Sequence, residues 1–401
     1  MRYFSLSDNH PGGAELPGLT DSDRPPSPAG WRDRLGDLSG AFADLGTFLP
    51  LMIGVFAAQR LDPTGVLVGF GLFALATAFI YRRPVPVQPM KAVAAVVIAG
   101  GLGAAGTAAT GLLLGMVLPL LAAAGAVGAL GRRIPHSVMH GIQLGVGLYL
   151  IWGGVRLGMQ QPWLGAGALV VLLMLQRTPF KPLAALAVVV VAAFWGATRP
   201  DAQLPAFSLG LWWPHWHWPE LSAFWGSTRD VVFPQLALTL TNATVITAAI
   251  AAERFPDDRE RITPDRLALS QGLLNLVLAP FGAFPMCHGA GGLVVQHRFG
   301  ARTGLAPAIF GTCCLALGLL LGPQALTLFT VLPLAAIGAL LIPAGIDLAL
   351  SRRLRHSAPD QLLVIVLTGV SCVLLNVALG LLVGLLLEGL RTLWVRHRDT
   401  G

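Results

Sequence analysis

Charged residues are scarce in this sequence: Asp, Glu, Lys and Arg make up 12% of the 401 residues, against about 25% in an average soluble domain. Apolar residues make up 54% of the chain and form long runs. This combination excludes an ordinary soluble domain. It predicts an all-α, polytopic protein that spans a lipid bilayer.

Cysteines are few, and catalytic motifs are absent. The four cysteines lie in apolar stretches, without the paired spacing of a disulfide framework or a zinc site. No HExxH motif, nucleotide-binding loop or Ser/His/Asp set appears in the sequence. We therefore expect neither an enzyme nor a pump driven directly by ATP, and we expect no cofactor and no metal ion.

The net charge of +7 does not indicate a nucleic-acid partner. Nucleic-acid binding requires basic residues concentrated on one face, whereas here they are scattered between apolar runs. Loop charge at the membrane surface is the better explanation.

The chain divides into two tails and a membrane part. Residues 1–30 are rich in Pro, Gly, Ser and Asp and predict a disordered cytoplasmic tail without the apolar core of a signal peptide. A short cytoplasmic tail is expected at 396–401. Between them we expect fourteen spans, at 38–59, 64–81, 85–100, 104–130, 136–155, 163–176, 180–197, 231–252, 266–283, 285–297, 303–322, 325–349, 360–376 and 377–394.

The positions of the basic residues predict the orientation. With fourteen crossings and both termini in the cytoplasm, most Lys and Arg residues fall on the cytoplasmic side. Only Arg60, Arg156, Arg199 and Arg229 fall outside, and Lys91 lies within the membrane. This asymmetry agrees with the positive-inside rule and supports both the number of spans and the orientation.

A Trp-rich external linker is expected at 199–230, between a first seven-span repeat at 31–198 and a second at 231–395. Its five tryptophans are typical of an aromatic belt at a membrane surface, with or without an amphipathic helix. His215 and His217 suggest a metal site as an alternative. That reading is weaker, because no further Cys or carboxylate ligands lie nearby.

The segment from Pro84 to Lys91 contains three prolines in six residues and cannot belong to a regular helix. We expect extended chain that becomes helical at about Met90, inside the bilayer, where irregular backbone must be buried in protein or line a cavity. The first turn of that helix would present free N–H groups and the positive end of the helix dipole, which together favour an anion. Gln88 and Lys91 lie beside that end.

The second half of the chain repeats this order of features. Pro89 follows Asp44 by 45 residues, and Pro285 follows Leu240 by 45 residues. Because seven spans is an odd number, the second repeat must be inverted. Inverted repeats with two broken helices at the midplane are typical of secondary transporters. We expect the two half-helices to point their N-termini at one pocket, which would suit a dianion better than a cation.

Four blocks of the sequence resemble the molybdate transporter family related to the SulP sulfate permeases, and the resemblance covers about residues 31–395. The blocks are Asp44–Leu51, Pro84–Ala92, Phe281–Gly292 and Arg298–Gly304. The resemblance implies molybdate uptake and a seven-plus-seven inverted-repeat fold with core and gate domains. Relatives with this fold often form dimers, so a homodimer is left open. We expect no cytoplasmic regulatory domain of the kind that follows the membrane part of the sulfate permeases, and this expectation favours the molybdate branch.

The candidate substrate-binding residues lie at the two breaks and on the first and eighth spans. Lys91 is the strongest, because a lysine near the bilayer centre costs about 3 kcal/mol or more and is usually functional; otherwise it would snorkel to the cytoplasmic surface. Gln88 would donate to an oxyanion or satisfy backbone groups freed by the prolines. The full set is Thr47, Gln88, Met90, Lys91, Thr239, Asn242, Cys287, His288 and Gly289.

Asp44 and His288 are the candidates for coupling transport to an ion. Asp44 could carry a proton, pair with Lys91 or cap a helix. His288 titrates near physiological pH and could contact a dianion, or it could be a packing residue. The hydroxyl and amide groups on the first and eighth spans could simply bond a helix carbonyl. His140 and Gln143 have weaker claims, since polar contacts between helices would explain them.

We therefore expect a secondary active transporter, a symporter, that imports a tetrahedral oxyanion across the bacterial inner (plasma) membrane by alternating access. Molybdate is the first choice of substrate, with tungstate and sulfate left open. The alternative is an anion channel, or a sulfate, bicarbonate or carboxylate carrier, on the same scaffold.

Overall fold

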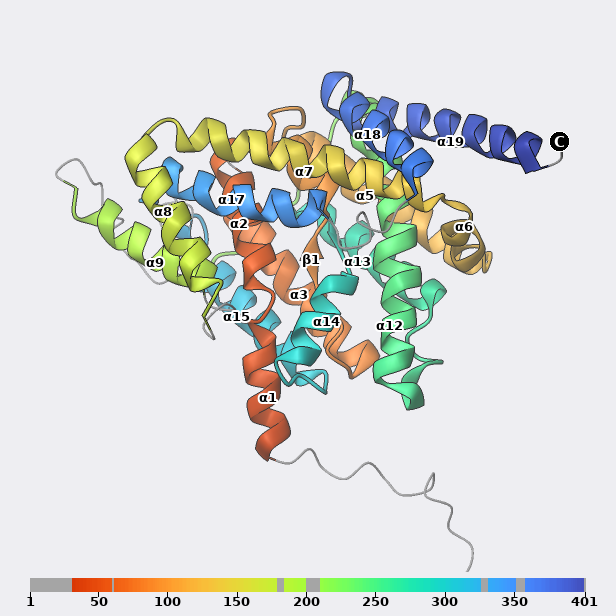
Figure 1. The fold of residues 1–401 in the computed structure, drawn as a ribbon. Helices are drawn as coiled ribbons and strands as arrows, with labels where there is room; N and C mark the ends of the chain where they lie inside the picture. Colours follow the sequence, from red (N-terminus) through yellow and green to blue (C-terminus); the bar gives the residue numbers. More distant parts are fainter. Residues whose placement is uncertain are drawn as a thin grey trace, which may run out of the picture.

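The computed structural model describes residues 31–59, 61–178, 184–199, 210–325, 331–350 and 358–399 (Figure 1). The expected N-terminal tail at 1–30 lies outside these residues. The described chain is mostly helical.

The described residues of the first half of the chain form nine helices and one short strand. They are α1 (Trp31–Ala41), α2 (Leu45–Gln59), α3 (Pro63–Tyr81), β1 (Gln88–Pro89), α4 (Lys91–Ile98), α5 (Ala104–Ala123), α6 (Val127–Arg133), α7 (His136–Gly158), α8 (Pro162–Leu175) and α9 (Ala184–Ala197).

The second half opens with one long helical segment made of α10 (Leu221–Ser227), η3 (Thr228–Val232), α11 (Phe233–Leu238), η4 (Thr239–Ile246) and α12 (Thr247–Arg254). The elements after it are η5 (Pro256–Asp258), α13 (Pro264–Leu278), η6 (Ala279–Phe281), β2 (Met286–Cys287), α14 (Ala290–Arg298), α15 (Leu305–Leu321), α17 (Leu334–Ala349), α18 (Pro359–Leu374) and α19 (Val377–Asp399).

Among the described residues, five helical segments are long and apolar enough to cross a membrane, and six more are shorter apolar helices. The long ones are Pro63–Tyr81, Ala104–Ala123, His136–Gly158, Leu221–Arg254 and Val377–Val395. The expectation of a helical membrane protein is confirmed at this level. The protein is an integral membrane protein.

Several expected boundaries were wrong. The span expected at 104–130 is two helices, α5 and α6, because the chain turns at Gly125, whose φ of +60° suits a residue without a side chain. The span expected to begin at 231 begins at Leu221, which shortens the linker. At the other end of the chain, α19 continues to Asp399, so the tail expected from residue 396 is helical up to that point.

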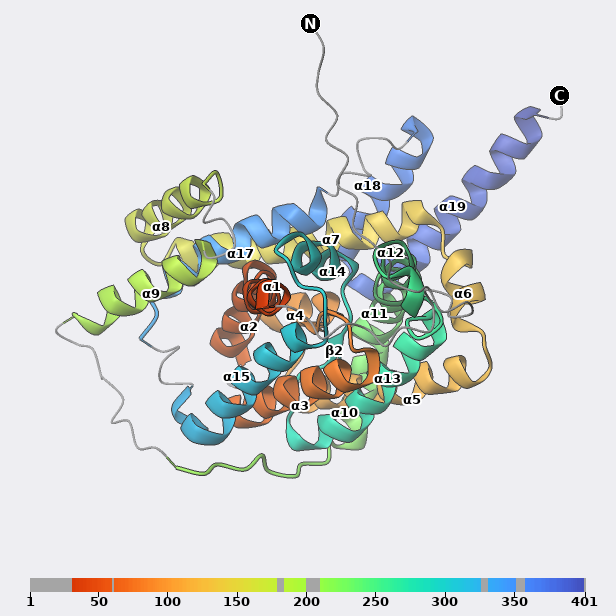
Figure 2. The same cartoon turned by 90° about the horizontal axis from the view of Figure 1, so that it is seen from below.

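Two bundles make up the molecule (Figures 1 and 2). We define the larger bundle as α1 to α6 with α10 to α15, where α3 packs along α15 and α5 packs along α13. The smaller bundle contains α7, α8, α9, α17, α18 and α19, and α7 packs along both α17 and α18. The two bundles meet along a seam where α2 contacts α17 and α4 contacts α7.

Close contact of glycines holds α7 against α17. A Cβ atom built on Gly147 would lie 2.6 Å from the carbonyl oxygen of Gly345, and one built on Gly154 would lie 2.8 Å from that of Gly338. Small residues at these positions let the two backbones approach, which is the usual way helices associate in lipid. These two helices therefore form the closely packed centre of the smaller bundle.

The described part of the Trp-rich segment, residues 210–220, is extended and lies across the ends of two helices. Trp212 donates its backbone N–H to Leu319 at 2.8 Å, and His217 donates its own to Pro280 at 2.7 Å. The rings of Trp213, Trp216 and Trp218 are exposed. The segment thus presents aromatic side chains outward without forming a helix before Leu221.

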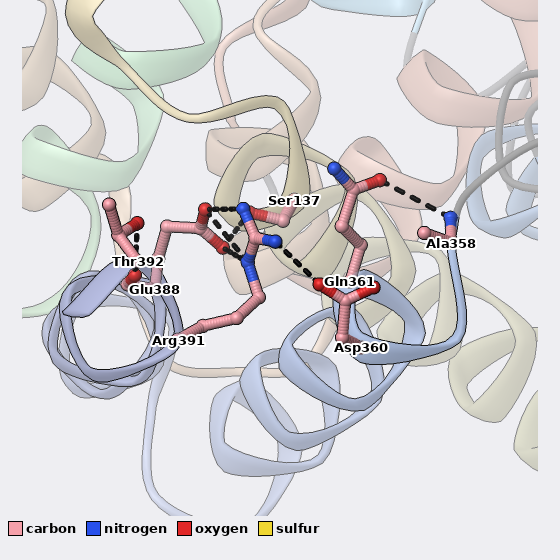
Figure 3. Close-up of polar contacts among 7 residues, drawn as sticks. All are labelled: Ser137, Ala358, Asp360, Gln361, Glu388, Arg391 and Thr392. Atoms are coloured by element: carbon pink, nitrogen blue, oxygen red, sulfur yellow. Dashed lines mark hydrogen bonds and ion pairs between the residues drawn. The ribbon is translucent and has the colours of Figure 1, made fainter. Parts of the chain in front are cut away.

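A polar cluster joins three helices of the smaller bundle (Figure 3). Arg391 of α19 pairs with Glu388 on the same helix and with Asp360 of α18, each at 2.6 Å. Ser137, near the start of α7, donates its hydroxyl to Glu388 at 2.7 Å. Glu388 is buried, so its charge depends on these partners.

We predict that Arg391→Ala lowers the thermal unfolding midpoint of the detergent-solubilised protein by several degrees, because it leaves the Glu388 carboxylate buried without its cation. The matched control is Arg254→Ala, which removes a pair with Glu253 whose side chains are 44% and 70% exposed. Such an exposed pair contributes little. Equal midpoints for the two variants would contradict the prediction.

Candidate functional site

The two breaks meet at the centre of the structure. β1 pairs with β2 in an antiparallel arrangement that places Gln88 opposite Cys287 and Pro89 opposite Met286. The backbone N–H of Met90 donates to the carbonyl of Pro285 at 2.9 Å. The expectation that two broken segments share one location is confirmed by this pairing.

A side chain completes the pairing of the second break. Asn275 of α13 donates its amide to the carbonyl of Met286 at 2.6 Å and accepts the Met286 N–H at 2.8 Å. The carboxamide thus takes the place of a neighbouring strand. Extended backbone in the interior of a membrane protein needs such partners, because no water satisfies it there.

Gln88 lies packed against the start of α14. Its side-chain amide donates to the carboxylate of Asp44, at the turn between α1 and α2. A Cβ atom built on Gly289 would overlap the Gln88 carboxamide, and one built on Gly292 would lie 2.6 Å from its nitrogen and 2.8 Å from an Asp44 oxygen. The glycines of the second break therefore admit the side chain of the first.

A cavity of about 260 Å³ opens at the N-termini of the two half-helices, between the larger and the smaller bundle. Its polar lining combines the cation Lys91, the carboxylate Asp347 and several neutral amides. The lining residues are Gln88, Lys91, Gln143, Gln235, Leu238, Asn242, Ala243, Cys287, Gly291, Asp347 and Leu348.

A second cavity of about 120 Å³ adjoins the first on the other side of Lys91. Thr47 of α2 and Asp347 of α17 also line it. Lys91 and Asp347 thus border both spaces, and one comes from each bundle. By contrast, a cavity of about 380 Å³ between α2, α3 and α15 is lined by apolar side chains such as Phe48 and Met52, and it offers nothing to an anion.

Several of the candidate residues come together as the sequence predicts. Gln88, Lys91, Asn242 and Cys287 line the larger cavity, and Thr47 lines the smaller one. They come from four different stretches of the chain, and the β1–β2 pairing joins the two that contain the breaks.

Four other candidates lie behind the cavity wall. The side chain of Met90 is fully buried in the apolar core. Thr239 accepts a hydrogen bond from Gln235 at 3.0 Å and so supports a lining residue. Gly289 is the N-cap of α14 beneath Gln88, and Asp44 holds Gln88 from the opposite side. These residues position the lining and do not form it.

His288 points away from the cavity. Its Nδ1 lies 3.1 Å from the Pro86 carbonyl oxygen and its Nε2 lies 3.3 Å from the Ser270 hydroxyl. Its ring packs edge-on against Phe73 and Tyr81. The geometry therefore matches the packing alternative and places the imidazole out of reach of an anion in the cavity.

Gln235 and Asp347 are lining residues that the sequence reasoning missed. Gln235 of α11 accepts the backbone N–H of Ala92 at 3.0 Å, so a side chain already satisfies one N–H group of the first turn of α4. Asp347 is an acidic residue within an apolar helix. An ionisable residue inside a membrane span is a functional candidate by default, and that signal was present in the sequence.

These observations define the chemical character of the site. Two helix N-termini and one lysine favour negative charge, and the amides of Gln88, Gln143 and Asn242 can each donate a hydrogen bond. Asp347 opposes an anion unless it is protonated or paired. The site thus suits a small anion held by neutral donors and a single cation.

Comparison with solved structures identifies the fold. The transmembrane domain of a cyanobacterial bicarbonate transporter, BicA, matches with a TM-score of 0.66 and 16% sequence identity, over 88% of this chain and 98% of that chain. The murine solute carrier 26 family member A9, an anion transporter in the inward-facing state, matches with a TM-score of 0.62 and 14% identity, over 90% of this chain and 68% of that one. The chain therefore has the fold of the solute carrier 26 anion transporters.

Sequence comparison then identifies the family. Residues 36–150 and 227–348 match the family described as molybdate transporter of the MFS superfamily. Molybdate transporter 1 of Arabidopsis thaliana is 30% identical over 415 residues, covering 92% of this chain and 90% of the relative. Molybdate transporter 1 of Chlamydomonas reinhardtii is 30% identical over 472 residues, covering 87% and 90%. This chain belongs to the molybdate transporter family, as the sequence blocks predicted.

We predict that Gly289→Ala disrupts the site, because the new methyl group would occupy the space of the Gln88 carboxamide. Anion binding and the thermal unfolding midpoint should both fall. The control is Gly291→Ala two residues later, where a Cβ atom meets nothing within 4 Å. We expect this control to keep the wild-type midpoint, and a Gly289→Ala protein as stable as Gly291→Ala would refute the packing argument.

Proposed function

We propose that this protein is a secondary active transporter that imports molybdate across the bacterial plasma membrane. The observation that carries the proposal is the polar cavity at the paired N-termini of α4 and α14, with Lys91 on its wall. Membership of the molybdate transporter family supports the choice of substrate. The similar proteins from Arabidopsis thaliana and Chlamydomonas reinhardtii are named molybdate transporters.

The dianion would lie in the larger cavity, close to the first turn of each half-helix. Lys91 would supply the positive charge, and Gln88 and Asn242 would donate side-chain N–H groups to the oxyanion. Gln235, which accepts the Ala92 N–H in this structure, would release that N–H to the substrate. A site built from one cation and neutral donors binds reversibly, as transport requires.

Contacts between helices support an inverted repeat of seven spans and seven spans. In this scheme α3 and α13 are the second spans of the two repeats, and α5 and α15 are the fourth. The second span of each repeat packs along the fourth span of the other, as α3 with α15 and α5 with α13. The paired breaks, β1 and β2, also correspond to each other. Such an exchange of contacts is what a two-fold axis through the site would produce.

The two bundles would then be the core and gate domains of this repeat. The larger bundle carries both half-helices, and the smaller one supplies Gln143 and Asp347 to the cavity wall. Movement of one bundle against the other along the seam would open the cavity first to one side and then to the other. With the N-terminus in the cytoplasm, α4 would run from the cavity toward the exterior and α14 toward the cytoplasm.

Asp347 is the carboxylate best placed to couple transport to a proton. It shares two cavities with Lys91, so its charge is felt by any anion bound there. Its protonation would remove a repulsion just as the anion arrives. Asp44, the carboxylate expected for this role, instead holds Gln88 and lines neither cavity.

A carrier of sulfate or bicarbonate is the second candidate. The fold is shared with a bicarbonate transporter. The charged residues that line the cavity do not distinguish molybdate from another small oxyanion. Competition separates the two: a large excess of sulfate should reduce molybdate uptake only weakly under the first proposal, and strongly under the second.

We predict that Lys91→Ala removes most uptake of radiolabelled molybdate by molybdate-starved cells, because the cavity loses its cation. The amount of protein in the membrane should not change. Arg132→Ala, an exposed position on α6 outside the cavity, is the control for loss of a basic residue. Wild-type uptake by the Lys91→Ala protein would count heavily against the proposed site.

We predict that Asp347→Asn lowers the KM for molybdate about fivefold, the effect of removing about 1 kcal/mol of charge repulsion across the cavity. The same variant should flatten the dependence of uptake on external pH. Asp347→Glu keeps the charge and should keep the wild-type KM. A raised or unchanged KM in the asparagine variant would argue against a carboxylate that opposes the anion.

A further inference from the structure

A third polar cavity, of about 470 Å³, lies at the opposite end of α4 from the site. It is bordered by the C-terminal end of α4, by Tyr149 of α7, by Arg229 and Asp230 of η3 and by Asn376 at the turn between α18 and α19. Residues of both bundles therefore contribute to it, and it lies on the same seam as the central cavity.

About one and a half helical turns of apolar residues separate the central cavity from the third cavity. On α4, residues 92–95 lie between the lining of the central cavity and that of the third cavity, and on α7 residues 144–148 do so. At 1.5 Å per residue, the lining residues of the two cavities are about 7 to 9 Å apart along each helix. Val93, Val146 and Val231 from three helices in this layer are each fully buried. Contacts of α7 with α4 and with α11 join the two bundles along this seam.

The charges of the third cavity come from one adjacent pair. Arg229 donates to Asp230 through Nε at 2.8 Å and through a terminal nitrogen at 3.1 Å. Its side chain is 65% exposed, whereas that of Asp230 is 18% exposed. An ion pair this exposed contributes little stability, so the guanidinium can exchange its partner at small cost.

We propose that this cavity is the outer vestibule of the transport path and that Arg229 is its anion-recruiting residue. The ligand class is a small oxyanion with two negative charges. The inference rests on the proposed function and on the orientation given there, in which the C-terminus of α4 faces the exterior.

The electrostatics of the vestibule explain why a cation is needed. The C-terminal end of a helix carries the negative end of its dipole, and α4 points that end into the vestibule. Arg229 is the one cationic residue among the described residues of the lining. It offsets the dipole and the adjacent Asp230 carboxylate, so the vestibule repels anions less than it would without the guanidinium. Asp230 competes with the anion for the guanidinium, so that the anion is attracted and not retained.

The test is molybdate uptake by intact cells, since the external medium then reaches only the outer face. We expect Arg229→Gln to raise the KM about threefold to tenfold at low ionic strength and to leave the maximal rate unchanged. The difference should shrink toward 0.5 M salt, where the Debye length is only about 4 Å. Asp230→Asn should lower the KM, because it frees the guanidinium.

Two further variants separate charge from structure. Arg229→Lys keeps the charge and should keep the wild-type KM, whereas Arg156→Gln removes an exposed arginine on α7 that does not line the vestibule and should change nothing. An unchanged KM in Arg229→Gln, or a lysine variant that behaves like the glutamine variant, would overturn the inference. Absence of uptake by the wild-type protein would instead overturn the proposed function.

Discussion

Backbone groups inside a bilayer need partners, and this requirement acts most strongly where the chain leaves the helical conformation at residues 84–90 and 284–289. The two breaks satisfy each other through the β1–β2 pairing, and Asn275 supplies the remaining bonds to Met286. The rest of the site follows from this solution. The pairing fixes α4 relative to α14, packs Gln88 against the glycines of the second break and places Lys91 on the cavity wall.

The site balances attraction and repulsion. Lys91 and two helix N-termini attract an anion, while Asp347 faces the same cavity from the other bundle. Gln235 accepts an N–H that an anion would otherwise use. These opposing groups reduce the net stabilisation of a bound dianion, and they divide its contacts between two bundles. A change in the relative position of the bundles therefore changes the affinity, which is the thermodynamic condition for coupling motion to release.

The prolines allowed the breaks to be predicted, because the limits they impose are covalent and local. Gln88 and Lys91 were predicted for the same reason, since they adjoin the break in sequence. The sequence did not predict whether the His288 side chain points into the cavity or away from it. Neighbouring side chains of extended chain point to opposite sides, so Cys287 faces the cavity and His288 turns into the core. Asp347 carried a local signal, as an ionisable residue within an apolar span. Which cavity Asp347 and Gln235 line depends on how α17 and α11 are rotated, and packing sets that rotation.

The pairing of the two breaks also has a consequence for biosynthesis. The partner of β1 lies roughly 200 residues further along the chain, so the first break leaves the ribosome long before its hydrogen-bonding partner exists. At about 5 to 20 residues per second, the delay is about 10 to 40 s. During that interval the polar backbone around Gln88 has to be sheltered by the insertion machinery or held at the membrane surface. The first break of the nascent chain therefore lacks its backbone partners until the second half has been synthesised.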